Sequence, residues 1–151
     1  KLKKHMKQLI LGIDETEIIK AEEALKIKFP DVLRKAWLTY NVIDLQGGWW
    51  VFPIFDVRAP RKTCSHIVNE NSTNGWSELQ PDNVFAIADN GSGNQLVIKH
   101  IDGVAENDVY HWHHETGKLK KWKPGLDSIL ARAIENRESI EKLYLKYGQK
   151  G

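Results

Sequence analysis

Two short apolar runs flank a polar, glycine-rich turn near the middle of the chain, and this pattern constrains the fold most. Residues 84–88 read Val-Phe-Ala-Ile-Ala, residues 89–94 read Asp-Asn-Gly-Ser-Gly-Asn, and a second apolar run begins at Leu96. Glycine and asparagine tolerate the positive φ angles that tight strand connections require. We therefore expect a β-hairpin here, in a chain whose two ends have helical patterns.

The two strands of this hairpin are expected at about residues 84–88 and 95–100. Further strands are expected on either side of them. Aromatic and β-branched residues at 49–57 predict an edge strand or a bent strand, because Pro53 has no N–H for a ladder hydrogen bond. Turn residues at 102–103 and 116–117 separate two more strands, expected at about 108–113 and 118–122. Between these groups we expect a short helix over 61–70, carrying Cys64 and Ile67, and a polar loop over 69–75.

Helices are expected before and after the strands. Residues 14–17 fit a capping pattern, and apolar residues then recur at helical spacing to predict a helix over about 15–27. Pro30 ends this helix and starts a second one, which places Leu33, Trp37 and Tyr40 on one face.

The most regular helical pattern lies at the C-terminal end of the chain. After Pro124-Gly125, apolar residues recur every three or four positions as far as Tyr147, and Gly148 is a C-terminal cap. The order of elements predicts an α+β fold, with N-terminal helices, a central antiparallel or mixed β-sheet meander and a C-terminal helix packed on the sheet. We expect a single domain over residues 1–151, in which residues 1–12 form a peripheral basic helix.

The charge balance excludes some classes of partner. Lysine and arginine total 22 and aspartate and glutamate total 20, so the net charge of +2 does not favour nucleic acid. No apolar run approaches the roughly 20 residues that span a bilayer. The first residues do not resemble a secretory signal, and the single cysteine, Cys64, suits a reducing compartment. We therefore expect a cytoplasmic location.

Several short motifs follow one another in a characteristic order. They are Phe-Pro-Asp at 29–31, Tyr40-Asn41, Gly47-Gly48, the strand–turn–strand segment at 85–94, the histidine-containing strand at 109–115, and the helical start at 126–130. This order resembles the SUKH superfamily, with its Smi/Knr-like fold, a group of bacterial immunity proteins and fungal cell-wall regulators. The resemblance covers about residues 14 to 135. Asn94 stands where the family commonly carries Asp, and Val42 where Gly is usual.

The resemblance implies a binding protein. Members of the superfamily include immunity proteins that neutralise toxins by protein–protein contact, and none of the matched positions forms a catalytic set. We therefore expect a non-enzymatic protein-binding domain without a cofactor, with a polymorphic toxin domain as its partner. One alternative is a regulatory or scaffold domain of the same fold without a toxin partner. Another is a metal-dependent enzyme that uses the strand with His111 and His113.

The histidines of that strand are the sharpest candidates for chemistry. His111 and His113 point to one face of a strand, about 7 Å apart, and His100 on a neighbouring strand offers a third nitrogen. No further ligand at a defined spacing completes a metal set. A surface or cross-strand role for these histidines is favoured, and the sequence predicts no metal site.

Six tryptophans in 151 residues form the second candidate group, because tryptophan is enriched at binding hot spots. Trp37 is expected in the core. Trp49 and Trp50 are adjacent, so one of them faces inward and the other outward. The candidate partner-binding residues are Trp50, Trp76 in the polar loop, His111 and His113.

Three other patterns are weaker. Gly91-Ser92-Gly93 is not a phosphate loop, because a strand follows it where such loops need a helix N-terminus. Trp122 offers a ring for stacking on a base, and the lysines around it offer phosphate contacts, but the near-neutral total charge disfavours nucleic-acid binding. Glutamates at 15, 17, 22 and 23 offer a local acidic patch, but the chain has no overall negative charge. An inhibitor of a basic nuclease cleft benefits from a negative face, so a non-nuclease toxin or a regulatory scaffold role is more open here than is usual for the family.

Overall fold

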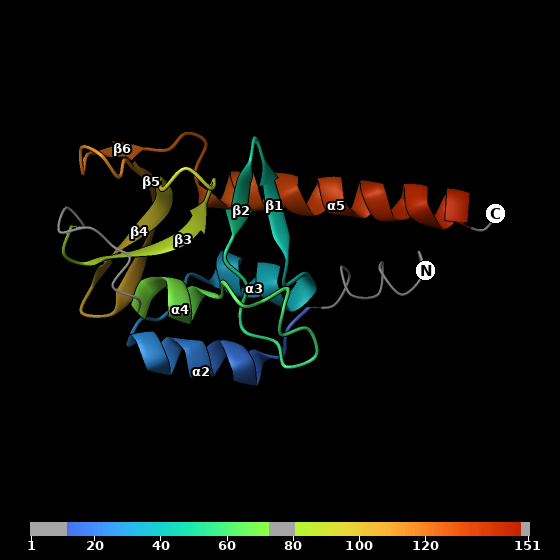
Figure 1. Cartoon of the computed structure of the whole chain (residues 1–151), viewed down its shortest axis with the longest axis horizontal. Helices are drawn as coiled ribbons and strands as arrows, with labels where there is room; N and C mark the ends of the chain where they lie inside the picture. Colours follow the sequence, from blue (N-terminus) through green and yellow to red (C-terminus); the bar gives the residue numbers. More distant parts are fainter. Residues whose placement is uncertain (1–11, 73–80, 149–151) are drawn as a thin grey trace.

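The computed structural model describes residues 12–72 and 81–148, and it confirms the expected α+β architecture. Helices α2 and α3 come first, a six-stranded sheet follows, and a long C-terminal helix, α5, crosses behind the first strands (Figure 1). The helices are α2 (Glu15–Leu25), α3 (Asp31–Thr39), α4 (Ile67–Ser72) and α5 (Leu126–Gly148). The strands are β1 (Ile43–Gln46), β2 (Trp49–Val51), β3 (Val84–Asp89), β4 (Gln95–Ile101), β5 (Val104–Trp112) and β6 (Leu119–Lys121).

The sheet is a simple meander. Its strand order is β1-β2-β3-β4-β5-β6, and every pair of neighbours is antiparallel. The hairpin expected at 84–98 is present as β3 and β4, with Phe85 opposite Ile98. The turns at 102–103 and 116–117 are also confirmed, since Asp102, Gly103 and Gly117 have positive φ angles.

The first hairpin differs from expectation. No sequence pattern predicts β1, which is only four residues long and half exposed. The strand predicted over 49–57 is wrong in length, because β2 ends at Val51. It is also not an edge strand, since it lies between β1 and β3. The chain leaves the sheet at Pro53, whose nitrogen cannot continue the ladder.

Where β2 ends, two asparagine side chains make the hydrogen bonds that a neighbouring strand would otherwise make. The buried Asn41 accepts a hydrogen bond from the Ile54 N–H (2.9 Å) and donates one to the Ile54 carbonyl (2.7 Å). Asn71 of α4 does the same for the N–H and carbonyl of Ala86 on β3 (2.8 and 2.9 Å). Both amides satisfy buried backbone groups that would otherwise lack partners. Asn41 is thus a structural residue, which explains the Tyr40-Asn41 motif physically.

Helix α2 is two residues shorter than expected because of a contact with a distant turn. Lys26 adopts a left-handed conformation (φ 56°), and Lys28 N–H donates to the Gly103 carbonyl (2.7 Å). A Cβ at Gly103 would lie 2.6 Å from the Lys26 carbonyl oxygen, so only glycine allows this approach. Asp14 occupies the N-cap as predicted, but its side chain makes no capping hydrogen bond.

Helix α4 begins and ends later than the helix expected over 61–70. It starts at the buried Ile67, and the exposed Cys64 lies in the turns before it. The polar loop expected over 69–75 is helical as far as Ser72. The remainder of that loop, and the basic helix expected near the N-terminus, lie outside the described residues.

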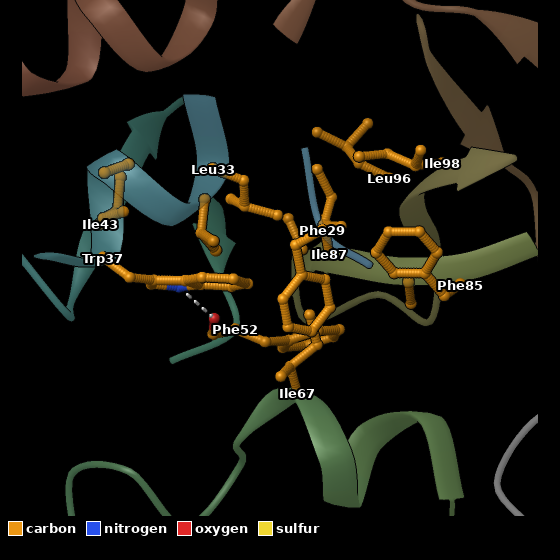
Figure 2. Packing of buried hydrophobic residues seen from close by; sticks show 14 of the residues in the cluster. Phe29, Leu33, Trp37, Ile43, Phe52, Ile67, Phe85, Ile87, Leu96 and Ile98 are labelled. Carbon is orange, nitrogen blue, oxygen red and sulfur yellow. Dashed lines mark hydrogen bonds between the residues drawn. The ribbon is translucent and has the colours of Figure 1, made fainter. Parts of the chain in front are cut away.

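The core lies between the helices and the sheet (Figure 2). Trp37 of α3 is fully buried, as expected, and its Nε1–H donates to the Phe52 carbonyl (3.1 Å). Phe29 packs edge-on against the Trp37 ring, with 5.0 Å between centroids, and also contacts Phe85. Aromatic pairs in this geometry add about 0.5–1.5 kcal/mol to the free energy gained by burial alone.

Helix α5 packs on the sheet through its first half. Leu126, Leu130 and Ala133 are buried against the core, and α5 contacts β1, β5 and α3. The C-terminal end of the helix extends beyond the sheet, as its right-hand end in Figure 1 shows. Among the described residues, no helix has the combination of length and hydrophobicity that a membrane span requires.

Candidate partner-binding surface

The β1–β2 hairpin places Trp50 on the surface. The turn passes through Gln46, Gly47 and Gly48, all with positive φ, and the Gln46 N–H donates to Asp44 Oδ1 (2.7 Å). The alternation expected for the tryptophan pair is confirmed: Trp49 is 8% exposed and Trp50 is 47% exposed. An indole that is half exposed retains a large apolar area for a partner to cover.

A pocket of about 100 Å³ lies between this hairpin and α5. Trp50 and Ile140 supply apolar walls, while Asp44, Asn136 and Arg137 supply polar groups. An apolar centre with polar groups around it is the usual composition of a protein-binding site. The pocket is large enough for one small side chain of a partner, and too small for a cofactor.

Tyr40, Arg137 and Glu141 form the polar floor next to this pocket. The Tyr40 hydroxyl donates to Glu141 Oε2 (3.2 Å), and the Arg137 guanidinium lies over the Tyr40 ring, 5.3 Å from its centroid. Arg137 Nε is 3.9 Å from Glu141 Oε1. Burial, followed by the charge and hydrogen bond of Glu141, raises the pKa of Tyr40. These contacts join the end of α3 to α5 beside the pocket.

Sequence reasoning missed this polar floor. Arg137 occupies a position where the apolar spacing of α5 calls for a hydrophobic residue, four residues after Ala133 and three before Ile140. A charged residue at such a position usually has a specific partner. That break in the pattern is the signal that could have revealed it.

An apolar strip continues from the pocket along α5. Leu143 and Tyr147 follow Ile140 at helical spacing and share its side of the helix. All three side chains are exposed. We call Trp50, Ile140, Leu143 and Tyr147 the Trp50 surface.

The histidine strand is packed differently from this surface. The His111 ring is stacked on Trp122, with 6.1 Å between centroids and 7° between planes, and lies edge-on to Trp49 at 5.6 Å. His113 is close, with 6.3 Å between the two imidazole centroids. Burial, with smaller contributions from His113 and Lys120, lowers the pKa of His111. His111 therefore packs mainly against tryptophans, and His113 is partly exposed at the end of β5.

His100 does not join these two histidines. On β4 it is opposite Ala105, whereas His111 is opposite Leu96, four residues away along the same strand. That separation is about 13 Å. Within residues 12–72 and 81–148, no group of three or more His, Cys, Asp or Glu side chains could hold a metal ion.

His114 has a role that sequence reasoning did not assign. Its backbone N–H donates to Asn94 Oδ1 (3.1 Å), and its ring Nδ1 is 2.7 Å from the same oxygen. This link joins the β3–β4 turn to the end of β5. The contact gives the Asn94 position of the strand–turn–strand motif a structural purpose.

The basic patch around Trp122 and the acidic patch of α2 are both partly neutralised by ion pairs within the fold. Trp122 packs on His111 and Trp49, so its ring is already in contact within the fold, and Lys121 lies 3.6 Å from Asp108. Arg34 of α3 lies 3.4 Å from Glu15 and 3.5 Å from Glu22, which are both on α2. Some of the charges in each patch are therefore paired within the fold. Trp76, the remaining candidate, lies outside the described residues.

Comparison with known protein families identifies the family of this chain. A model of the SMI1/KNR4 family (SUKH-1) matches residues 12–132, which include α2 to β6 and the buried start of α5. No curated protein matches the chain. Because the family match covers well over half of the sequence, the chain belongs to the SMI1/KNR4 family (SUKH-1).

Proposed function

We propose that this protein is a non-enzymatic immunity protein that neutralises a toxin by direct contact through the Trp50 surface. Membership of the SUKH-1 family supports a protein-binding role. The observation that carries the proposal is the half-exposed Trp50 beside a small pocket with polar groups around it. Tryptophan and tyrosine are over-represented among the residues that contribute most to binding.

The chemistry of the surface defines the partner. A side chain of the toxin that is small and apolar would enter the pocket and cover Trp50 and Ile140. Asp44 and Arg137 offer one acceptor and one donor for polar groups at the edge of the contact. The toxin is inhibited because this contact covers its working surface, without any covalent step.

The charge distribution favours a toxin whose contact face is not strongly basic. The α2 glutamates are partly paired with Arg34, and the chain carries a net charge of +2. A strongly basic nuclease cleft would gain little from electrostatic steering toward such a protein. A cytoplasmic location is part of the proposal, because the exposed thiol of Cys64 persists in a reducing compartment.

The test combines rescue and binding. The genes next to the one that encodes this protein are searched for a toxin, and that toxin is expressed in a sensitive host with the wild-type protein, with Trp50→Ala, or with Ile101→Ala. Ile101 is a matched control, because it is also exposed and apolar but lies at the β4–β5 turn, away from the Trp50 surface. We expect rescue and co-purification of the toxin with the wild type and the control, and loss of both with Trp50→Ala.

Three results would each reject part of the proposal. If the wild type neither rescues the host nor binds the toxin, the immunity function is wrong. If it binds other proteins through Trp50 without rescue, the domain is a regulatory scaffold. If Trp50→Ala rescues as well as the wild type does, the toxin is bound by another face.

A further inference from the structure

A second pocket borders the Trp50 pocket at the β1–β2 turn. Its volume is about 160 Å³, and the turn, the segment between β6 and α5, and α5 itself all line it. Its walls include Gln46, Trp49, Trp122, Lys123 and Arg132, and we call it the Arg132 pocket. Gln46 lines both pockets, so they share a wall. A standard interface covers about 800 Å² on each partner, enough to include both.

The charged side chains that line the Arg132 pocket are all cations. Lys123 and Arg132 are exposed, and neither has a hydrogen bond or an ion pair with another described residue. None of the described residues that line the pocket is Asp or Glu. In the Trp50 pocket, by contrast, Asp44 accompanies Arg137. The Arg132 pocket therefore offers two cations without a counter-charge.

Two indole rings form the apolar wall beside these cations. Trp49 is buried, Trp122 is partly exposed, and their rings meet edge-on with 5.4 Å between centroids. The Trp122 N–H donates to the Val109 carbonyl of β5 (2.8 Å), which anchors the backbone just before Lys123. Apolar walls around charges of one sign focus the electric field into a cleft.

We infer that the Arg132 pocket binds an aspartate or glutamate side chain of the partner protein. The inference rests on the proposed function, because it assigns the chemistry of the partner next to the Trp50 surface. A guanidinium binds a carboxylate through two parallel hydrogen bonds, and the Lys123 ammonium adds a further donor. The methylene groups of the acidic side chain contact the two indoles.

The positions of the two pockets define the segment that the protein recognises. Arg132 and Asn136, one from each pocket, are four residues apart on α5, about 6 Å along the helix axis. Alternate residues of an extended chain are about 7 Å apart and point to the same side. An acidic residue two positions from a small apolar residue therefore matches the two pockets.

A carboxylate suits this pocket better than the phosphates of a nucleic acid. Nucleic-acid binding needs a series of cations along the phosphate backbone, and this pocket supplies two. On β6, Lys121 is already paired with Asp108, at 3.6 Å. The net charge of +2 also gives little general attraction for a polyanion.

Selection from a random peptide library displayed on phage tests the pocket without any toxin. The library is selected on the wild type, on Arg132→Gln and, as a matched control, on Lys142→Gln. The control also removes one exposed positive charge from α5, but Lys142 lines neither pocket. With the wild type and the control, we expect enrichment of Asp or Glu two positions from a small apolar residue, and with Arg132→Gln we expect none. No acidic enrichment with the wild type, or equal enrichment with all three proteins, would overturn the inference.

The affinity for the toxin gives the second readout. Arg132→Gln should weaken binding about tenfold or more, because it removes a charged hydrogen-bond donor to the carboxylate. Lys142→Gln should weaken binding by less than about twofold, and added salt should reduce the effect of Arg132→Gln. Calorimetry measures both affinities.

The outcomes separate this inference from the proposed function. If the wild type and Arg132→Gln bind the toxin equally well, the inference is wrong and the proposed function stands. If no toxin binds the wild type, the proposed function is wrong, and the peptide selection alone decides the inference. A DNA or RNA oligonucleotide that binds the wild type but not Arg132→Gln would overturn the inference in favour of a nucleic acid.

Discussion

The two halves of α5 carry the same sequence pattern in opposite environments. Both have side chains on one face at spacings of four and three, in the series Leu126, Leu130, Ala133, Arg137, Ile140, Tyr144 and Tyr147. The first three are buried, and the last three are exposed. Helical periodicity thus determines which face is apolar, but a neighbouring element decides whether that face is covered.

The largest difference between the halves should appear on truncating a leucine in the buried half. Leu130 is 1% exposed, so Leu130→Ala removes core contacts and leaves a cavity. We expect a loss of about 2–5 kcal/mol in the free energy of unfolding, measured by denaturant titration. A loss below about 1 kcal/mol would mean that the first half is not packed as described.

A smaller effect is expected where the two halves meet. Tyr40→Phe removes the hydroxyl that donates to Glu141 but keeps the ring under Arg137. The free energy of unfolding should fall by about 1 kcal/mol. Tyr147→Phe is the matched control, because Tyr147 is exposed, and it should change the same quantity very little. Equal effects of both variants would show that the Tyr40–Glu141 hydrogen bond does not stabilise the fold.

The free energy of unfolding should also depend on pH, through the packing of His111 on Trp49 and Trp122 next to the buried half of α5. Ile129 of α5 lines a small pocket together with Trp49 and Trp122, the two indoles that pack on His111. The pKa of His111 is lowered in the fold, chiefly by burial, so the unfolded chain binds a proton more readily. The stability from neutral His111 is complete above pH 6.5 and is lost as the pH falls through its folded pKa.

His66, whose pKa burial also lowers, adds to this loss in the same pH window. Burial raises the pKa values of Glu70 and Asp89, so their contribution is lost in the opposite direction, as the pH rises through their folded pKa values. We expect His111→Gln to lose less stability than the wild type between pH 7.5 and pH 5.5, measured by denaturant titration at each pH. The variant keeps the pH-dependent loss of stability that comes from His66. If His111→Gln loses as much stability as the wild type over this range, the packing of His111 against the two tryptophans is contradicted.

The smallest effect should come from the exposed half. Leu143→Ala removes the same atoms as Leu130→Ala, but from a side chain that is already 53% exposed. The free energy of unfolding should change by no more than about 0.5 kcal/mol, measured as for Leu130→Ala. A large loss would indicate that another part of the chain covers this side of α5.

Residues close together in sequence supplied most of the correct expectations. The hairpin around residues 89–93 follows from turn chemistry between two apolar runs, and the burial of Trp37 follows from helical spacing. The opposite orientations of Trp49 and Trp50 follow from the two-residue period of a strand. Trp50 was therefore predictable as an exposed candidate, although its pocket was not.

Distant contacts account for what sequence reasoning missed. Helix α2 ends at Leu25 because Gly103 approaches its last turn, and beyond β2 the side chain of Asn41 pairs with the backbone of Ile54. His100 has the chemistry of a metal ligand, yet strand register places it away from His111. None of these contacts has a signature in the local pattern.

The sequence by itself determined the α+β class, the order of every helix and strand that it predicted and the apolar face of each, because turn chemistry and periodicity act between near neighbours. Only the tertiary structure decided that β1 forms, where α2 ends, which histidines meet, and how far along α5 the apolar face is covered. Each of those depends on residues tens of positions apart, as in the hydrogen bond from Tyr40 to Glu141. That hydrogen bond lies beside the Trp50 pocket, so the candidate site itself is a product of the tertiary fold.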